Sequence, residues 1–183
     1  MKRSFTKGQS LKRCRSLASK WIQHRPLIEL LSPIRWSVVE QEHYVNAGRR
    51  IFGIEDVSFW PDLDDALKAG GGADVVLFSS SLHYFERPMM LLGEACSASQ
   101  HSVVIDRSPA WSGSEAHLAM QKVSLYERPV EYPCWVLSEP SVMSTLRESF
   151  DIVCTWNEVM PIPTFPKSAE VTFLGAAGMG RRR

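Results

Sequence analysis

The residues with the clearest chemical potential are carboxylates that directly follow strand-like apolar runs. Glu40 closes the run IRWSVVE at 34–40, and a carboxylate there can accept two hydrogen bonds from the vicinal hydroxyls of a ribose. Alternatively, Glu40 is a solvated acid whose charge interacts favourably with the dipole at the N-terminus of the next helix. Asp62 follows a second run at 56–60, where it could bind an adenine amino group or cap the next helix. The two acids predict a site for an adenosine-containing cofactor.

A third run, ADVVLFSS at 73–80, is apolar on both faces, which predicts a central parallel strand, and it leads into a small polar turn. The serines Ser79, Ser80 and Ser81 would let a cofactor or substrate approach the backbone. His83 is a candidate general base, with a packed or surface histidine as the alternative. Asp106 ends the run HSVVID at 101–106 and is the second candidate catalytic residue.

The segment after Asp106 is predicted to face the substrate. Arg107 could pair with an anionic substrate group or with one of the chain's own acids. Gln121, Tyr132 and Trp135 could line an acceptor pocket suited to a sugar, because aromatic rings stack on sugar faces and amides bind hydroxyls. The alternative for Trp135 is a place in the hydrophobic core.

These residues need a scaffold that brings strand ends together, and the apolar pattern supplies one. Strands alternate with helices along the chain, which predicts an α/β fold with a mostly parallel sheet that has helices on both faces. In such sheets ligands bind at the carboxyl ends of the strands, so Glu40, Asp62 and the Ser79–Tyr84 turn are expected to face one common cleft. The strands are expected near 34–40, 56–60, 73–80, 101–106, 151–156 and 170–175. The helices are expected near 41–50, 62–69, 88–98 and 138–150, with Pro88 in the first turn of the third and Ser138 as the cap of the fourth.

Composition narrows the function classes. Residues 26–180 hold all 20 acids and ten of the 21 basic residues, so this body carries a net charge of about −10 and is not expected to bind nucleic acid. No apolar run is long enough for a membrane span. The four cysteines form no CxxC and no Cys/His cluster, which predicts no metal site, reduced thiols and a cytoplasmic protein.

Five segments together resemble a family of methyltransferases that depend on S-adenosyl-L-methionine (SAM) and accompany bacterial surface-polysaccharide biosynthesis. The resemblance covers about residues 21–175 and implies a Rossmann-like class I methyltransferase fold, SAM as cofactor, and a small-molecule or sugar acceptor. Methyl transfer needs orientation and at most one base from the protein, so the lack of a catalytic triad agrees with it. The segments are WSVVEQEHYVNAGRRIFG, DVVLFSSSLHYFERP, VVIDRSPAW, MQKVSLYERPVEYPCWVLS and FDIVCTW.

The sequence departs from this family at its start. The family begins with an apolar strand and a Gly-rich turn, about twenty residues before the acid that corresponds to Glu40. Residues 10–19 fall at that place, but they contain Lys12, Arg13 and Arg15 and no glycine. A central strand cannot bury unpaired cations cheaply, so the first strand and loop are expected to be missing or degenerate. The expected organisation is a leader at 1–20, a partial methyltransferase domain at 21–176 and a basic tail at 177–183.

Residues 1–25 hold eight basic residues and no acid, and three origins stay open for them. They could be a poorly ordered basic leader, a transit peptide, or an altered start fused to an intact body. A secretory signal is excluded, because no apolar stretch follows the first basic residues.

Two other functions remain possible on the sequence. One is a non-catalytic remnant of a methyltransferase that no longer binds SAM, which the basic residues at 12–15 favour. The other is a nucleotide- or NAD-binding Rossmann enzyme, which shares the acid after a strand but normally requires a GxGxxG turn. The glycines of GAAGMG at 175–180 are expected to form a tail, since no helix follows them.

Replacement of residues 1–20 tests the interpretation of the leader. A chain with an apolar strand and a Gly-Gly-x-Leu-Gly-Ser turn in place of these residues should be more stable and bind SAM more tightly than the unmodified chain, because glycines let the backbone approach the cofactor. Calorimetric titration with SAM measures the difference. Micromolar binding by the unmodified chain would show that its leader forms a working loop.

Overall fold

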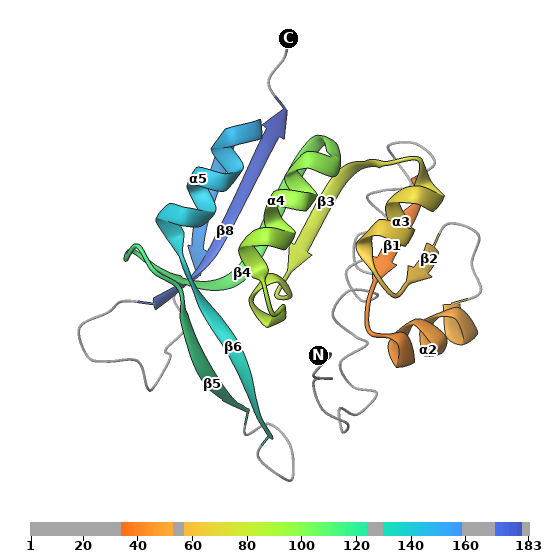
Figure 1. Ribbon diagram of the computed structural model, residues 1–183, viewed down its shortest axis with the longest axis horizontal. Coiled ribbons are helices and arrows are strands. Elements are labelled where there is room, and N and C mark those ends of the chain that lie inside the picture. The colour runs from red at the N-terminus through yellow and green to blue at the C-terminus, as the bar shows by residue number, and fades with distance from the viewer. Residues whose placement is uncertain (1–33, 53–56, 124–129, 159–170, 181–183) are drawn as a thin grey trace. The chain divides into compact units, whose positions relative to one another are not determined.

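The computed structural model describes residues 34–52, 57–123, 130–158 and 171–180 (Figure 1). The chain divides into two compact units, Met1–Gly71 and Gly72–Arg183, and each is described by itself. The predicted leader and the degenerate loop at residues 10–19 lie outside the described residues.

The smaller unit is a β-α-β-α arrangement. Strand β1 (Trp36–Val39) is followed by helix α2 (Glu42–Phe52), strand β2 (Val57–Trp60) and helix α3 (Leu63–Gly70). The two strands pair in parallel, with Val38 opposite Phe59. Val38, Val45 and Phe59 form a small buried core, which Trp36, Phe52 and Val57 flank. The predicted alternation of strands and helices is confirmed in this unit.

Helix α2 lies unusually close to β2. The Arg49 guanidinium donates from Nε and Nη2 to the Phe59 carbonyl oxygen, at 3.2 and 2.7 Å. Gly48 is buried on the face of α2 that meets the strand, and a Cβ added to it would overlap the Phe59 ring. The absence of a side chain at Gly48 therefore sets how closely the helix can pack on the sheet.

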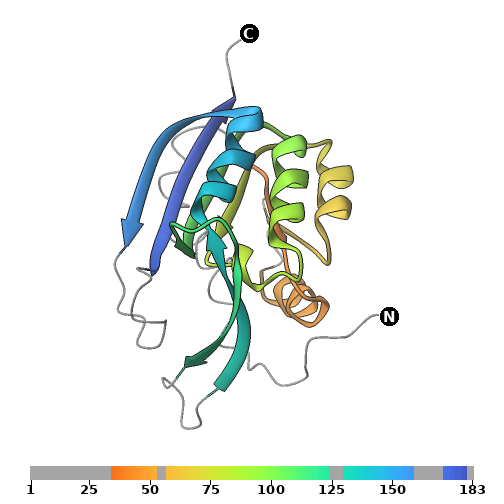
Figure 2. The ribbon, with the colours of Figure 1, turned by 60° about the vertical axis from the view of Figure 1, so that its left-hand side comes forward.

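The larger unit is built on a six-stranded sheet with two helices on one face (Figures 1 and 2). Its strands are β3 (Ala73–Ser79), β4 (Ser99–Trp111), β5 (His117–Val123), β6 (Val130–Ser138), β7 (Phe150–Glu158) and β8 (Val171–Gly180). Their order is β5-β6-β4-β8-β7, and β3 pairs with β4. The pairs β3–β4 and β4–β6 are parallel, while β8 runs antiparallel to β4 and β7, and β5 antiparallel to β6.

Helices α4 (Pro88–Ala98) and α5 (Glu139–Ser149) pack side by side over this sheet (Figure 2). Both begin where the sequence predicts. Pro88 lies in the first turn of α4, and Ser138 caps α5 by accepting a hydrogen bond from the Ser141 N–H. The buried core comprises Phe78, Leu82, Leu92, Ala95, Cys96, Val103, Ile105, Ala110, Leu137, Val142, Met143, Leu146, Phe150, Leu174 and Ala176.

Three features of the larger unit differ from the sequence prediction. The strand expected at 101–106 continues to Trp111, and the segment after it forms the hairpin β5–β6, which the sequence did not predict. The prediction that GAAGMG forms a tail is wrong, because these residues form the second half of β8. Small residues suit this position: side chains at Gly175 and Gly178 would collide with Trp156 and Phe150 of the neighbouring strand.

Strand β3 was expected at the centre of the sheet. Among the described residues it pairs with β4 alone, so it lies at an edge of the larger sheet. One face of β3 is nevertheless covered, since Phe78 and Val76 belong to or pack against the core. Val75, on the other face, is 54% exposed.

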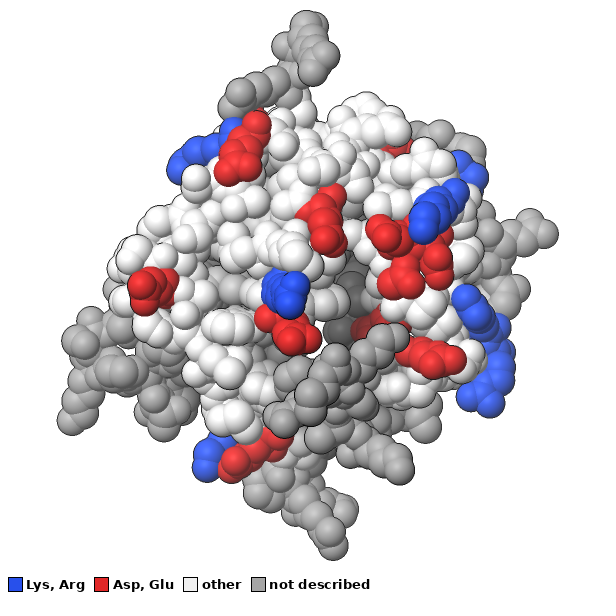
Figure 3. Space-filling view, viewed as in Figure 1, with Lys and Arg blue, Asp and Glu red and all other residues white. Residues whose placement is uncertain are grey.

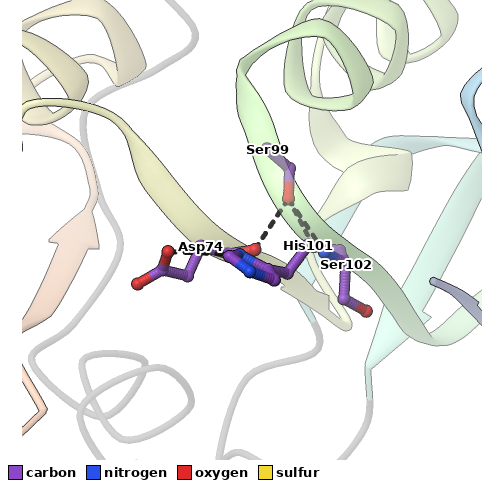
Figure 4. Close-up of polar contacts among 4 residues, drawn as sticks. All are labelled: Asp74, Ser99, His101 and Ser102. Atoms are coloured by element: carbon purple, nitrogen blue, oxygen red, sulfur yellow. Dashed lines mark hydrogen bonds and ion pairs between the residues drawn. The ribbon is translucent and has the colours of Figure 1, made fainter. Parts of the chain in front are cut away.

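At their amino ends, β3 and β4 are joined by a serine side chain in addition to the backbone pairing of Ala73 with Ser99 (Figure 4). The register shifts between Ala73 and Val75, and the Ser99 hydroxyl lies 3.0 Å from the Asp74 carbonyl oxygen. The hydroxyl oxygen of Ser99 also accepts from the Ser102 N–H at 3.2 Å. These contacts satisfy backbone groups that the bulge would otherwise leave unpaired.

Replacement of Gly48 by alanine tests the close packing of α2 on β2. Overpacking against Phe59 should lower the free energy of unfolding by about 1–3 kcal/mol, more than the helix propensity of alanine restores. Gly93→Ala is the matched control, because Gly93 lies inside α4 and a Cβ added to it would meet nothing within 4 Å, and it should be stabilising by about 0.5–1 kcal/mol. Thermal unfolding measures both variants. Equal stabilisation by both would contradict the packing argument.

Candidate functional site

The carboxyl ends of β3 and β4 carry a compact polar cluster. The parallel register places Ser79 opposite Asp106. The Ser79 side chain is buried, at 1% exposure, and its hydroxyl donates to Asp106 Oδ2 at 3.0 Å. The Ser80 N–H donates to the Asp106 carbonyl oxygen at 2.8 Å. Two of the predicted cofactor residues and one predicted catalytic residue are therefore in direct contact.

The backbone leaves both strands in an uncommon conformation. Ser80 and Arg107, which directly follow the Ser79–Asp106 pair, have φ angles of 51° and 53°. Such left-handed geometry costs a non-glycine residue about 1–2 kcal/mol. At Arg107 it coincides with a register shift between β4 and β8, where Ile105 and Ser108 flank a β-bulge. Strained residues and bulges of this kind cluster at functional sites, where they redirect side chains.

Arg107 is engaged within the chain. Its Nε lies 3.3 Å from Asp106 Oδ2, and its Nη2 donates to the Ser79 hydroxyl at 3.5 Å. The Arg107 side chain is 41% exposed and that of Asp106 is 22% exposed. This ion pair is the alternative that the sequence left open for Arg107, and contact with an anionic substrate group stays a prediction.

His83 lies in the 3-10 helix η2 (Leu82–Tyr84), which follows the polar turn. Its side chain is 2% exposed, and burial lowers its pKa from 6.5 to about 4. Its Nδ1 is buried without a hydrogen-bond partner among the described residues. The imidazole is thus a packed, neutral group, which is the alternative that the sequence left open beside a general base.

Tyr84 brings the turn after β3 to the hairpin β5–β6. Its hydroxyl donates to Gln121 Oε1 at 2.8 Å, and its ring packs edge-on against Tyr132, with 5.5 Å between ring centroids. Gln121 and Tyr132 are directly opposite each other in the hairpin. Two of the predicted acceptor residues therefore meet, together with a tyrosine that ends the predicted Ser79–Tyr84 turn and to which the sequence assigned no contact with the acceptor. The sequence feature that could have identified Tyr84 is its position in an aromatic pair just after the serines.

Trp135 does not join this group. It lies three residues after Tyr132 on β6 and therefore on the opposite face of the hairpin, where it pairs with Leu118. Its side chain packs against the hydrophobic core of the larger unit. The core position was the alternative that the sequence left open for Trp135.

In the smaller unit, Glu40 follows β1 as predicted. Its side chain is partly buried, and Oε2 accepts from the Gln41 N–H at 3.2 Å. Burial raises the pKa of this carboxyl, while the hydrogen bond from the Gln41 N–H and the electrostatic interaction with His43 lower it. The carboxylate is thus partly desolvated, with no hydrogen bond from Oε1 to another described residue.

Asp62 caps helix α3, as its alternative role proposed. Its Oδ1 accepts from the Asp65 N–H at 2.7 Å. Asp64 and Asp65 add acids to the first turn, and acidic side chains gather over α3 on the face shown in Figure 3. Acids in the first turn interact favourably with the positive end of the helix dipole. Binding of an adenine group by Asp62 stays a prediction.

The predicted common cleft also stays a prediction, because its residues are divided between the two units. Glu40 and Asp62 belong to the smaller unit, and the Ser79–Tyr84 turn belongs to the larger one. Within the described ranges, no group of three or more potential metal ligands occurs, and no helix has the length and apolar character needed to cross a membrane.

The buried His83 predicts a dependence of stability on pH. Above about pH 6.5 the imidazole is neutral in both states; between that pH and about 4 the unfolded chain binds a proton that the folded chain excludes. Stability should therefore fall on acidification, by about 2 kcal/mol near pH 5. Urea unfolding at about pH 7 and about pH 5 should show this loss reduced in His83→Leu but not in His101→Gln, whose histidine is exposed. An equal loss in all three chains would contradict the prediction.

Comparison with known proteins supports the fold. The sequence matches no protein-family profile, and no curated protein is significantly similar to it. Among solved structures, the N-terminal domain of EvdMO1 with SAH bound is 17% identical, with 94% of this chain and 82% of that chain covered and a TM-score of 0.52. The same domain in the presence of SAH and D-fucose gives 14% identity, coverage of 95% and 85%, and a TM-score of 0.53.

A further similar structure is magnesium protoporphyrin IX methyltransferase from Synechocystis PCC 6803 with bound SAH, at 10% identity, coverage of 96% and 90%, and a TM-score of 0.49. At these identities the likeness concerns the fold, and it is carried by the two EvdMO1 structures. The chain has an α/β, Rossmann-like fold, which it shares with the EvdMO1 domain.

Proposed function

We propose that this protein transfers a methyl group from SAM to a small-molecule acceptor, a sugar or a precursor of a surface polysaccharide, in the cytoplasm. The observation that carries the proposal is Glu40, a partly buried carboxylate that follows the first strand of a β-α-β unit. The fold supports the same cofactor, since the EvdMO1 domain that shares it was crystallised with SAH bound.

The residues present could bind the cofactor by hydrogen bonds and by close approach of the backbone. Glu40 Oε2 accepts from the Gln41 N–H, which leaves Oε1 to accept hydrogen bonds from ribose hydroxyls. Partial burial strengthens such bonds, because less water competes for the carboxylate. The small side chains at Ser79, Ser80 and Ser81 would let the remainder of the cofactor approach the backbone.

When bound, SAM would supply a methyl group on a positively charged sulfur: the acceptor oxygen bonds to the methyl carbon as the carbon–sulfur bond breaks, and SAH is the leaving group. The protein then has to orient the acceptor and receive its proton. Asp106 is the candidate for the proton, although Arg107 and Ser79 already hold its Oδ2. His83 is a weak base at neutral pH, since its pKa is about 4, and we assign it a packing role.

A second function is favoured by the basic residues at 12–15, which stand where the family has an apolar strand. In that case the chain is a methyltransferase-like protein that no longer binds SAM. A nucleotide- or NAD-binding enzyme is the third possibility, because it would use Glu40 in the same way. Titration of the full chain with SAM, SAH and NAD distinguishes the three.

Substitution of Glu40 tests the cofactor site. Glu40→Gln keeps the shape of the side chain but removes its charge, so SAM or SAH binding should weaken by about 1–3 kcal/mol, the range for hydrogen bonds to a charged group. Glu42→Gln is the matched control: it removes an exposed acid two residues away, in the first turn of helix α2, and should leave affinity unchanged. Calorimetry measures all three chains.

Two results would count against the proposed function. Absence of SAM and SAH binding by the unmodified chain would favour the non-catalytic protein. Equal affinities in the unmodified chain and Glu40→Gln would show that the cofactor, if bound, is held elsewhere.

A further inference from the structure

The hairpin β5–β6 presents two different faces. On one face Gln121 lies opposite Tyr132, and deeper along the same face lie Cys134 and Val136, at 7% and 2% exposure. On the other face Leu118 and Met120 are 62% and 57% exposed. The first face is the one that meets η2, which carries Tyr84.

Three polar or aromatic side chains from three elements meet on this first face. Tyr84 comes from η2, Gln121 from β5 and Tyr132 from β6. The Tyr84 hydroxyl donates to Gln121 Oε1 at 2.8 Å, and its ring meets the Tyr132 ring at 67°. Tyr84 is 40% exposed and Gln121 is partly buried, so the group is open to solvent on one side. We call these three residues the tyrosine–amide group.

The contact with Tyr84 determines what Gln121 can offer to a ligand. An amide has one oxygen that accepts and one NH2 that donates. Because Oε1 accepts from the Tyr84 hydroxyl, this contact engages the oxygen of the amide and leaves its NH2 group for another partner. Nε2, with its two protons, has no partner among the described residues. The group therefore presents hydrogen-bond donors beside two aromatic rings.

We propose that Tyr84 is a positioning residue for the methyl acceptor: its hydroxyl fixes the Gln121 amide so that Nε2 donates to an oxygen of a sugar ring that packs on the tyrosine rings. This inference rests on the proposed function, because it assigns an acceptor side to the same enzyme. Tyr84 itself follows the Ser79–Ser81 turn within a few residues, which ties the group to the carboxyl end of β3.

The experiment uses the full chain and two independent measurements. Calorimetry with SAH reports the cofactor site. Saturation-transfer NMR with D-fucose, D-glucose and D-galactose, with and without SAH, reports the acceptor site. The variants are Tyr84→Phe, which keeps the ring and removes the hydroxyl, Gln121→Glu, which keeps an acceptor for Tyr84 but removes the NH2 donors, and their double variant.

Both single variants should weaken hexose binding about fivefold or more, the loss of one hydrogen bond, with SAH affinity unchanged. Because Tyr84 acts through Gln121, Tyr84→Phe should cost much less in the Gln121→Glu background. Met120→Gln, on the opposite face of β5, is the control and should bind hexoses like the unmodified chain. A purely structural role for Tyr84 would lower the unfolding temperature without this coupling, and would overturn the proposal.

The remaining outcomes separate this inference from the proposed function. If the unmodified chain binds SAH but none of the hexoses, the inference is wrong and the methyltransferase function stands. If it binds a hexose with the expected dependence on Tyr84 but no SAH, the tyrosine–amide group stands as a sugar site and the proposed function fails. If it binds neither, both are wrong.

Discussion

The parallel pairing of β3 with β4 is the constraint on which the polar end of the larger unit depends. It sets Ser79 opposite Asp106, so that a buried hydroxyl meets a carboxylate at 3.0 Å. The two strands leave this pair through left-handed residues, Ser80 and Arg107. The bulge at Arg107 turns its guanidinium back onto Asp106 and Ser79. A shift of register by one residue would separate these groups, because it would exchange the faces of the strand.

The hairpin β5–β6 depends on the same sheet. Strand β6 joins it through Leu137 and Ser138, which pair with Ala110 and Trp111 at the end of β4. The core then fixes the orientation of the hairpin, since Leu137 is buried in it and Trp135, on the same face, packs against it. Tyr84 of η2 contacts Gln121 and Tyr132 on the opposite face, and Leu82 anchors η2 at 0% exposure. The apolar core thus positions a polar group that contributes little to the core itself.

The two candidate acids of the smaller unit, Asp62 and Glu40, differ in their exposure to solvent. Asp62 is exposed and satisfied by the Asp65 N–H, an ordinary helix cap. Glu40 is partly buried and shows a raised pKa from desolvation. Burial of a carboxylate is costly unless hydrogen bonds compensate it. Of the two acids, Glu40 therefore gains more from a ligand with hydroxyl groups, which is why it carries the functional proposal.

The sequence alone determined the elements and their caps. Apolar periodicity and local hydrogen bonding decide where helices and strands begin and end, so the strands near 34–40, 56–60, 73–80 and 151–156 and the caps at Asp62 and Ser138 are found where expected. Once the strands are predicted, the sequence also identifies the residues that directly follow each of them. That part of the candidate site, Glu40, Ser79 and Asp106, was accessible because it needs no knowledge of long-range contacts.

Only the tertiary structure decided how those residues are used. Tyr84 and Gln121 are 37 residues apart in the chain and meet only because the hairpin folds against η2. Tyr132 and Trp135 were grouped together until the hairpin placed them on opposite faces, since side chains alternate along a strand. The glycine-rich end resembled a tail because glycines carry no apolar pattern, and it became β8 through pairing with β4 and β7. Pairing between distant segments depends on register and packing, which no local pattern contains.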